Sequence, residues 1–382
     1  NTRVGDAFQV WQNVPTANIA FSRTNSLGAN VTATNILTVM DAISDCSTAP
    51  GTPAGGIAQP RSVIYDDSNG SILIELGDDP DVTLGFAGAV CFDSDGGSSN
   101  FFTRGYAVLN GKGVVTQADI AELQAVMIHE FGHLLGLDHS QINLECLNNA
   151  LGCSADAMAG LPTMFPFLLT DGGPEMSTPA TDDIAGLSEL YPETVNDPAN
   201  GKESYTTTRG RISGHILFSD GATPAQGFNV IARKVNDPLT IQDESKTTAV
   251  SSSSGFLFTG DNGNPIVPYP GFSPSAFGSR DQNLIGYYEI PGLPPGDYTV
   301  EVEALDSSFT AGSGVGPLGG LGIVFPMPST QCPDGEFLNT GESDNDVCTD
   351  QTPQHVTAGG KIETGTDIIL NGTPPRFDAW ES

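Results

Sequence analysis

The chain has 382 residues, of which 14 are basic and 46 acidic, so its formal net charge is −32. Such a surface repels nucleic acid and anionic membranes, which argues against both as partners. A chain of this length exceeds what one hydrophobic core usually serves, and we expect two domains. Solubility is the favoured explanation of the acidic excess. Calcium binding and attraction to basic substrates are the alternatives.

The N-terminal part, residues 1–110, is predicted to form strands and one helix. A first strand region is expected around Val10 and around Ile19. Apolar side chains recur at helical spacing over residues 32–43, which predicts the helix, and a loop rich in Gly and Pro follows it at 49–60. The other expected strands are short apolar or β-branched runs bounded by Asp, Asn and Gly: 63–65, 72–76 and 106–109. We expect a mixed sheet beside helices.

Two turns in this part are rich in oxygen ligands, residues 66–70 and 93–97. Calcium takes six to eight oxygen ligands, and loops of this kind supply several. Neither turn has the EF-hand spacing, and Asp and Asn are also frequent in turns because they bond to their own backbone. Turn formation is therefore favoured over a structural calcium ion, which stays open as the alternative.

The six cysteines fall into three couples along the chain. Many pairings are open, and proximity and shared domain favour these: Cys46 with Cys91, Cys146 with Cys153, and Cys332 with Cys348. An even count in an acidic, lysine-poor chain indicates an oxidising compartment. No apolar run approaches the roughly 20 residues of a membrane helix, and no signal peptide opens the chain. We expect a secreted protein, with Asn1 as the start of a processed or trimmed form.

A second helix is predicted to begin at Thr116, because Asp119 lies three residues on and completes a capping box. This helix leads into the pattern HExxHxxGxxH, from His129 to His139. Two histidines four residues apart stand on one face of a helix and reach a single metal ion. Gly136 tolerates the positive φ that turns the chain back. The turn then brings His139 to the same ion as the third ligand.

Three neutral imidazoles predict a zinc site with its fourth position left to water, which is the arrangement of catalytic zinc. Zinc lowers the pKa of its bound water, and a neighbouring carboxylate then accepts the proton. Glu130 is the predicted catalytic base, and His129, His133 and His139 are the predicted metal ligands. A bare HExxH arises often by chance, whereas the eleven-residue form fixes four positions and a glycine.

The motif resembles that of the metzincin metallopeptidases, and within them it is most similar to the matrixins. His139 is followed by Ser140, as in matrixins. Met164, flanked by prolines, resembles the methionine of the family's Met-turn and is preferred over Met158, which lacks those flanks. Residues 181–191 resemble the helix that closes a matrixin catalytic domain. Residues 83–89 resemble the strand along the upper rim of the cleft, and the alternative is an ordinary interior strand.

The chain also departs from the family's pattern. The segment between His139 and Met164 is longer than is usual in matrixins, and the Cys146–Cys153 couple is expected to brace it. No histidine precedes His129, so the second, structural zinc of many matrixins is not expected. No propeptide cysteine motif of the PRCGxPD type occurs in the sequence. Either the propeptide is absent from this form or latency is controlled in a different way.

The pattern changes after a polar, Pro- and Gly-containing stretch at 192–204, which we predict to be a linker. Alternating strands are expected near 211–218 and 228–233, and again around a Pro/Gly turn at 287–302. This half resembles the carboxypeptidase-regulatory-like and transthyretin-like β-sandwich modules. The remaining expectations are a closing strand within 362–370, an insertion at 309–352 stapled by its cysteines, and no catalytic role for His215 or His355.

The sequence thus predicts an α+β metzincin catalytic domain, with a mixed twisted sheet, an active-site helix and a C-terminal helix, followed by an all-β sandwich domain. The predicted boundaries are 1–191 for the peptidase domain, 192–204 for the linker, 205–372 for the sandwich and 373–382 for a tail. The predicted function is a secreted, extracellular zinc endopeptidase acting on protein or peptide substrates. The alternative is a secreted adhesion or binding protein whose peptidase half is vestigial.

Overall fold

The computed structural model describes most of the chain. The described residues are 2–22, 27, 30–46, 61–94, 100–148, 153–169, 175–225, 228–254, 286–304, 331–332 and 335–373. They form two compact units. The first unit contains Asn1–Val14, Asn18–Asp138 and Phe167–Pro179, and the second contains Pro15–Ala17, His139–Pro166 and Ala180–Ser382. Together they have the mixed α+β character that the sequence predicts.

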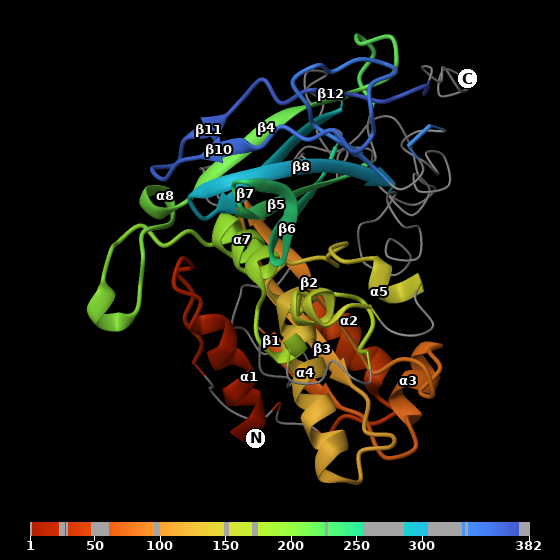
Figure 1. Cartoon of the computed structure of the whole chain (residues 1–382). Coiled ribbons are helices and arrows are strands. Elements are labelled where there is room, and N and C mark those ends of the chain that lie inside the picture. Colours follow the sequence, from red (N-terminus) through yellow and green to blue (C-terminus); the bar gives the residue numbers. More distant parts are fainter. Residues whose placement is uncertain are drawn as a thin grey trace. The chain divides into compact units, whose positions relative to one another are not determined.

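The first unit is built around one three-stranded sheet (Figure 1). Its elements are α1 (Thr2–Gln12), α2 (Ile36–Ser44), β1 (Arg61–Tyr65), α3 (Ser71–Leu76), β2 (Gly85–Ser94), β3 (Asn100–Leu109), α4 (Gln117–Leu134) and the 3-10 helix η1 (Glu175–Ser177). The strand order is β1-β3-β2, with β1 parallel and β2 antiparallel to β3. The predicted mixed sheet is confirmed, and β2 lies at its edge.

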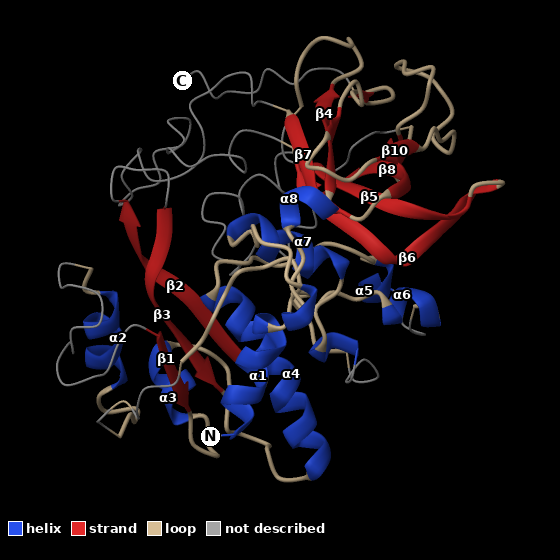
Figure 2. Cartoon of the chain, turned by 90° about the vertical axis from the view of Figure 1, so that its left-hand side faces the viewer, coloured by secondary structure: helices blue, strands red, loops and turns tan. Residues whose placement is uncertain are grey.

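The two faces of β3 explain how helices cover this sheet. Val108 points to the side where β1, α2 and α3 supply the partners of one apolar cluster. Positions 105 and 107, occupied by Gly105 and Ala107, face the opposite side of the sheet. A Cβ on Gly105 would lie 2.7 Å from Leu134 Cδ2 of α4. The missing side chain therefore lets α4 approach the sheet closely. Figure 2 shows the sheet between α2 on one side and α1 with α4 on the other.

Two strand predictions in this unit are wrong. Val10 lies in helix α1, whose Ala7 and Trp11 are one turn apart and both fully buried, and Ile19 lies in a segment that is not a strand. Residues 72–76 lie in helix α3. The Asp66 carboxylate accepts hydrogen bonds from the backbone N–H groups of Ile72 (2.8 Å) and Leu73 (2.9 Å), which satisfies two donors of that helix's first turn.

The second unit contains two sheets and several short helices. Its helices are α5 (Glu145–Asn148), α6 (Ala155–Ala159), α7 (Thr181–Leu190), η2 (Pro198–Asn200) and α8 (Tyr205–Thr208). Its strands are β4 (Gly210–Leu217), β5 (Phe228–Asp237), β6 (Thr240–Ser253), β7 (Tyr287–Leu293), β8 (Gly296–Ala304), β9 (Glu336–Phe337), β10 (Gln354–Val356), β11 (Ile362–Glu363) and β12 (Ile368–Ile369). One sheet has the order β10-β8-β5-β6 with β9 beside β8, and the other has β11-β4-β12 with β7 beside β4.

One hydrophobic cluster joins these two sheets. It includes Ile212 and Ile216 of β4, Val230 of β5 and Val302 of β8, all 0% exposed. The expected strands at 211–218, 228–233 and 287–302 are confirmed, and the closing segment forms two short strands, β11 and β12, instead of one. Strand β6 was not predicted, because its sequence is largely polar and lacks alternation.

The three predicted disulfides are present: Cys46–Cys91, Cys146–Cys153 and Cys332–Cys348. The predicted linker contains η2, and at its start the N–H of Glu193 donates to Thr16 O (2.9 Å). The predicted boundaries remain predictions. The predicted loop at 49–60 and nearly all of the predicted tail lie outside the described residues, as does most of the predicted insertion before residue 331. No helix in the described ranges is long and apolar enough to span a membrane.

Candidate metal centre

Helix α4 carries the first two histidines, and its start is fixed as the sequence predicts. The side chain of Thr116 accepts from Asp119 N (3.2 Å), and the Asp119 carboxylate accepts from Thr116 N. This capping box satisfies donors that a helix N-terminus leaves without a partner. The helix then runs for 18 residues to Leu134.

Helix α1 holds α4 in place just before the histidines. The indole Nε1 of Trp11 donates to the carbonyl of Ile128 (2.8 Å), and Trp11 is fully buried. The ring of Phe8 stacks on that of Phe131, with 4.0 Å between centroids and 12° between planes. Contacts of this kind fix the rotation of α4 about its axis, and so the direction in which its histidines point.

The chain leaves α4 through Gly136, whose φ is 94° as the motif requires. The N–H of Gly136 donates to His133 O and that of Leu137 to Gly132 O, both at 3.0 Å. These bonds satisfy carbonyls at the helix C-terminus. A residue with a Cβ would be strained at this φ, so glycine is required for the turn towards His139.

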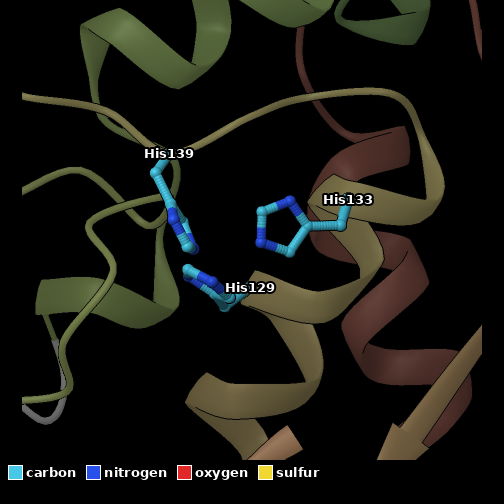
Figure 3. Close-up of side chains that lie close together, drawn as sticks. All are labelled: His129, His133 and His139. Carbon is cyan, nitrogen blue, oxygen red and sulfur yellow. The ribbon is translucent and has the colours of Figure 1, made fainter. Parts of the chain in front are cut away.

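The three histidines converge. His129, His133 and His139 each offer one ring nitrogen, and these nitrogens lie within 4.8 Å of one another (Figure 3). Nδ1 of His133 donates to the carbonyl of Leu137 (2.8 Å), which leaves Nε2 as the lone-pair nitrogen. Burial lowers the pKa of His133, which favours the neutral imidazole that a metal ion needs.

Glu130 lies next to His129 in sequence and is only 4% exposed. Among the described residues its Oε2 has no hydrogen-bond partner, and burial raises the pKa of the carboxyl group to about 8. A buried carboxylate without a partner is costly unless a ligand, water or ion completes it. Three converging imidazole nitrogens fit a zinc ion better than a hard, oxygen-preferring cation.

Met164 is buried beside the residues that follow the third histidine. The N–H of Ser140 donates to Met164 O (2.9 Å), and the N–H of Met164 donates to Asp183 Oδ1 (3.0 Å). The rejected alternative, Met158, lies in α6. A hydrogen bond therefore joins Met164 to the residue that follows His139, and the assignment of Met164 to a Met-turn stays a prediction.

Asp183 is a residue to which the sequence analysis assigned no role. Its carboxylate accepts from three backbone N–H groups, those of Thr163 (2.8 Å), Met164 (3.0 Å) and Ala180 (2.7 Å). It thereby joins the methionine turn to the first turn of α7. Burial, followed by the charge of Asp182, raises its pKa to about 7, and the three N–H donors oppose that shift. The sequence feature that could have indicated this role is the position of Asp183 in the first turn of a predicted helix, where a carboxylate is favourable.

Residues 76–192 match the family model of the matrixins, the M10 peptidases. They form a matrixin domain. The match includes the three histidines, Glu130, the methionine turn and α7, and it ends at the first residue of the predicted linker.

The other comparisons add little. No curated protein matches the chain. A candidate carbohydrate-binding protein from Pseudomonas aeruginosa is 9% identical, covering 44% of this chain and 90% of its own, with a TM-score of 0.15. An (S)-allantoin synthase is 12% identical over 66% of this chain and 82% of its own, also with a TM-score of 0.15. Scores this low carry no information on the second half of the chain.

The two oxygen-rich turns, at 66–70 and 93–97, are not part of the histidine triad. Among the described residues, the His129, His133 and His139 triad is the one group of three or more His, Cys, Asp or Glu that meets the geometry of a metal site. In the turn at 66–70, Asp67 Oδ1 accepts from Asn69 N (2.8 Å) and Ser71 Oγ (3.1 Å), so this carboxylate already serves the local turn. The turn at 93–97 lies largely outside the described residues, and calcium stays a prediction.

The two remaining histidines lie in strands of the second unit. His215 is in β4. His355 is in β10, and its Nδ1 lies 2.6 Å from an oxygen of Asp297.

Proposed function

We propose that this chain is a zinc-dependent endopeptidase that hydrolyses peptide bonds in protein substrates. The observation that carries the proposal is the convergence of three histidine nitrogens within 4.8 Å in a matrixin domain whose buried Glu130 follows the first of them. His129, His133 and His139 would hold the ion. A bound zinc ion supplies Lewis acidity towards the scissile carbonyl and lowers the pKa of water.

The chain's own residues would carry the proton and the substrate. Glu130, which directly follows His129 in the chain, takes a proton from the attacking water and returns it to the leaving amine nitrogen. The hydrogen bond from His133 Nδ1 to the Leu137 carbonyl keeps that imidazole in the tautomer whose Nε2 has a lone pair for the metal ion. Strand β2, at the edge of its sheet, offers backbone groups to which an extended peptide can add as a further strand.

We further propose that the protein is secreted and that residues 205–372 are a β-sandwich accessory domain. Three disulfides support an oxidising compartment. One apolar cluster shared by two sheets supports the sandwich. The alternative of a binding protein with a vestigial peptidase half is less favoured, because all three histidines and the glutamate are present and the histidines converge.

Metal removal tests the proposal. Casein cleavage is expected to fall to the level of the blank when a chelator strips the protein, and to return when zinc is added back in stoichiometric amount. Metal analysis of each sample accompanies the assay. Cleavage that persists in metal-free protein would exclude the zinc mechanism, whereas no cleavage by fully zinc-loaded protein would favour the binding-protein alternative.

Gly85 provides a second test, because β2 passes close to the proposed base. A Cβ on Gly85 would lie 3.2 Å from Glu130 Oε1 and 3.0 Å from Val108 O, tighter than ordinary contact. Gly85→Val should therefore displace the carboxylate and lower kcat by roughly ten- to hundredfold, since small displacements of a catalytic group are costly.

The matched control is Gly88→Val on the same strand, where a Cβ meets nothing within 4 Å. Zinc content and the thermal unfolding midpoint are measured for both variants. An equal fall in kcat for Gly85→Val and Gly88→Val would show that the strand, and not the approach to Glu130, is responsible.

A further inference from the structure

Strand β5 is buried on both faces, which is unusual for a strand in a domain of two packed sheets. Phe228, Val230 and Ala232 point into the cluster between the sheets. Side chains of the opposite parity, on the outer face, would ordinarily meet solvent. Yet Asn229, Ile231 and Arg233 are only 2%, 0% and 4% exposed. Some other part of the chain must cover this outer face.

The covering segment is the one that follows the third histidine. The side-chain amide of Asn229 donates to the carbonyl of Gln141 (3.3 Å), and the guanidinium of Arg233 donates to Asn143 Oδ1 (2.9 Å). Between them, Ile231 and Ile142 belong to one small buried cluster. Successive outward residues of β5 thus contact successive residues of the segment.

Asn143 is the centre of this contact. It is fully buried, and its φ of 59° is the one positive value among the described non-glycine residues. Its side-chain amide donates to the carbonyls of Ala157 in α6 (2.9 Å) and Lys246 in β6 (3.1 Å), while its oxygen accepts from Arg233. One side chain therefore fixes the segment to α6, β5 and β6 at once.

Arg233 is itself held by charge. Its Nε lies 3.9 Å from Glu301 Oε2, and the two side chains are 4% and 14% exposed. A second ion pair, Lys246 Nζ to Glu145 Oε1 at 2.9 Å, lies further along the segment. A buried guanidinium of this kind presents its donors in a fixed fork, so it defines the position of the amide that it contacts.

Each of the four residues after His139 therefore makes a hydrogen bond or a buried apolar contact with another segment of the chain. The N–H of Ser140 donates a hydrogen bond to Met164 O, and the next three residues contact the outer face of β5. A loop anchored at every residue has already lost its conformational entropy, so a ligand at its start binds metal without a further ordering cost. We propose that Arg233 and Asn143 are positioning residues, through which the outer face of β5 sets the affinity of the metal centre.

The test measures metal binding directly, because the inference rests on the proposed zinc function. The apparent zinc dissociation constant is measured by competition with a chromophoric chelator, and the cobalt-substituted protein gives a visible spectrum that reports ligand geometry. Arg233→Met and Asn143→Gly are each expected to weaken metal binding about tenfold or more, the range found for residues that orient metal ligands. Asn143→Gly keeps the positive φ and removes the side-chain bonds.

The control is Val230→Ala, which loosens the inner face of the same strand without contacting the segment. It should lower the unfolding midpoint while leaving the zinc constant within about twofold of the parent. Arg233→Lys keeps the buried charge opposite Glu301 and should recover part of the affinity. If Arg233→Met does not fold, Arg233→Lys and Asn143→Gly decide the question.

Unchanged metal affinity and cobalt spectrum in the folded variants of Arg233 and Asn143 would overturn the inference and leave these residues a purely structural role. Absence of zinc binding by the parent protein would instead refute the proposed function. The two failures are distinguished by the parent's own titration.

Discussion

Replacing Glu130 with Gln is expected to lower kcat/KM by about 10²–10⁴-fold, the usual contribution of a general base. The amide keeps the shape of the carboxyl group but cannot accept the proton of water. Zinc content should stay near one ion per chain, because none of the three histidines changes. Kinetics on a short peptide and metal analysis of the same sample check both halves of the prediction.

Glu122→Gln is the matched control, since Glu122 lies on the exposed face of the same helix. It should have kinetics close to those of the parent. If Glu130→Gln retained more than a few per cent of the parent rate, the proposed base would be wrong. If it lost zinc as well, the glutamate would have a role in holding the metal centre together.

Replacing Asp183 with Ala is expected to lower the free energy of unfolding by about 3–5 kcal/mol. The change leaves the N–H groups of Thr163, Met164 and Ala180 without their acceptor, and each buried donor so orphaned costs about 1–3 kcal/mol, with incomplete additivity. The methionine turn should loosen with it. Chemical denaturation monitored by circular dichroism gives the value.

Two controls bracket this result. Asp183→Asn keeps the shape and one oxygen acceptor, so its loss should be smaller than that of the alanine variant. Asp156→Ala, at an exposed position of α6, should stay within about 0.5 kcal/mol of the parent. A loss for Asp183→Ala no larger than that of Asp156→Ala would mean that water replaces the carboxylate at these donors.

The spacing of the candidate metal ligands could be predicted from sequence because it follows local rules. The spacing of His129 and His133 follows from the helix period, and Gly136 supplies the turn whose φ of 94° the motif required. Thr116 with Asp119 fixed the start of the helix for the same reason. Short-range rules decide these features, and no distant contact overrides them.

The mistaken predictions concern segments whose structure is decided by partners outside the segment itself. The apolar run at 72–76 has no strong preference of its own, and the Asp66 carboxylate, six residues upstream of Ile72, makes it a helix by bonding to its first turn. Val10 and Trp11 suit a strand locally, yet burial of Trp11 against α4 selects the helix. The hydrophobic pattern of these segments does not indicate that the Asp66 carboxylate or helix α4 will contact them.

The contact of residues 140–143 with β5 lay beyond prediction for a related reason. Alternating positions of β5 were expected to have one buried and one solvated face, and nothing in the sequence says what covers the second. The polar residues Asn229 and Arg233 are typical of an exposed face in a single-domain context. Their burial becomes intelligible only with the hydrogen bonds to Gln141 and Asn143 in view.

The contact between Trp11 and α4 also gives the molecule an optical probe. The chain has two tryptophans, and the other, Trp380, lies outside the described residues. Because the Trp11 indole donates to the carbonyl of Ile128, immediately before His129, its excited state senses the helix that bears the first two histidines. In a chain with Trp380→Phe, emission from this single fluorophore reports metal uptake and release in real time, without substrate and without a label.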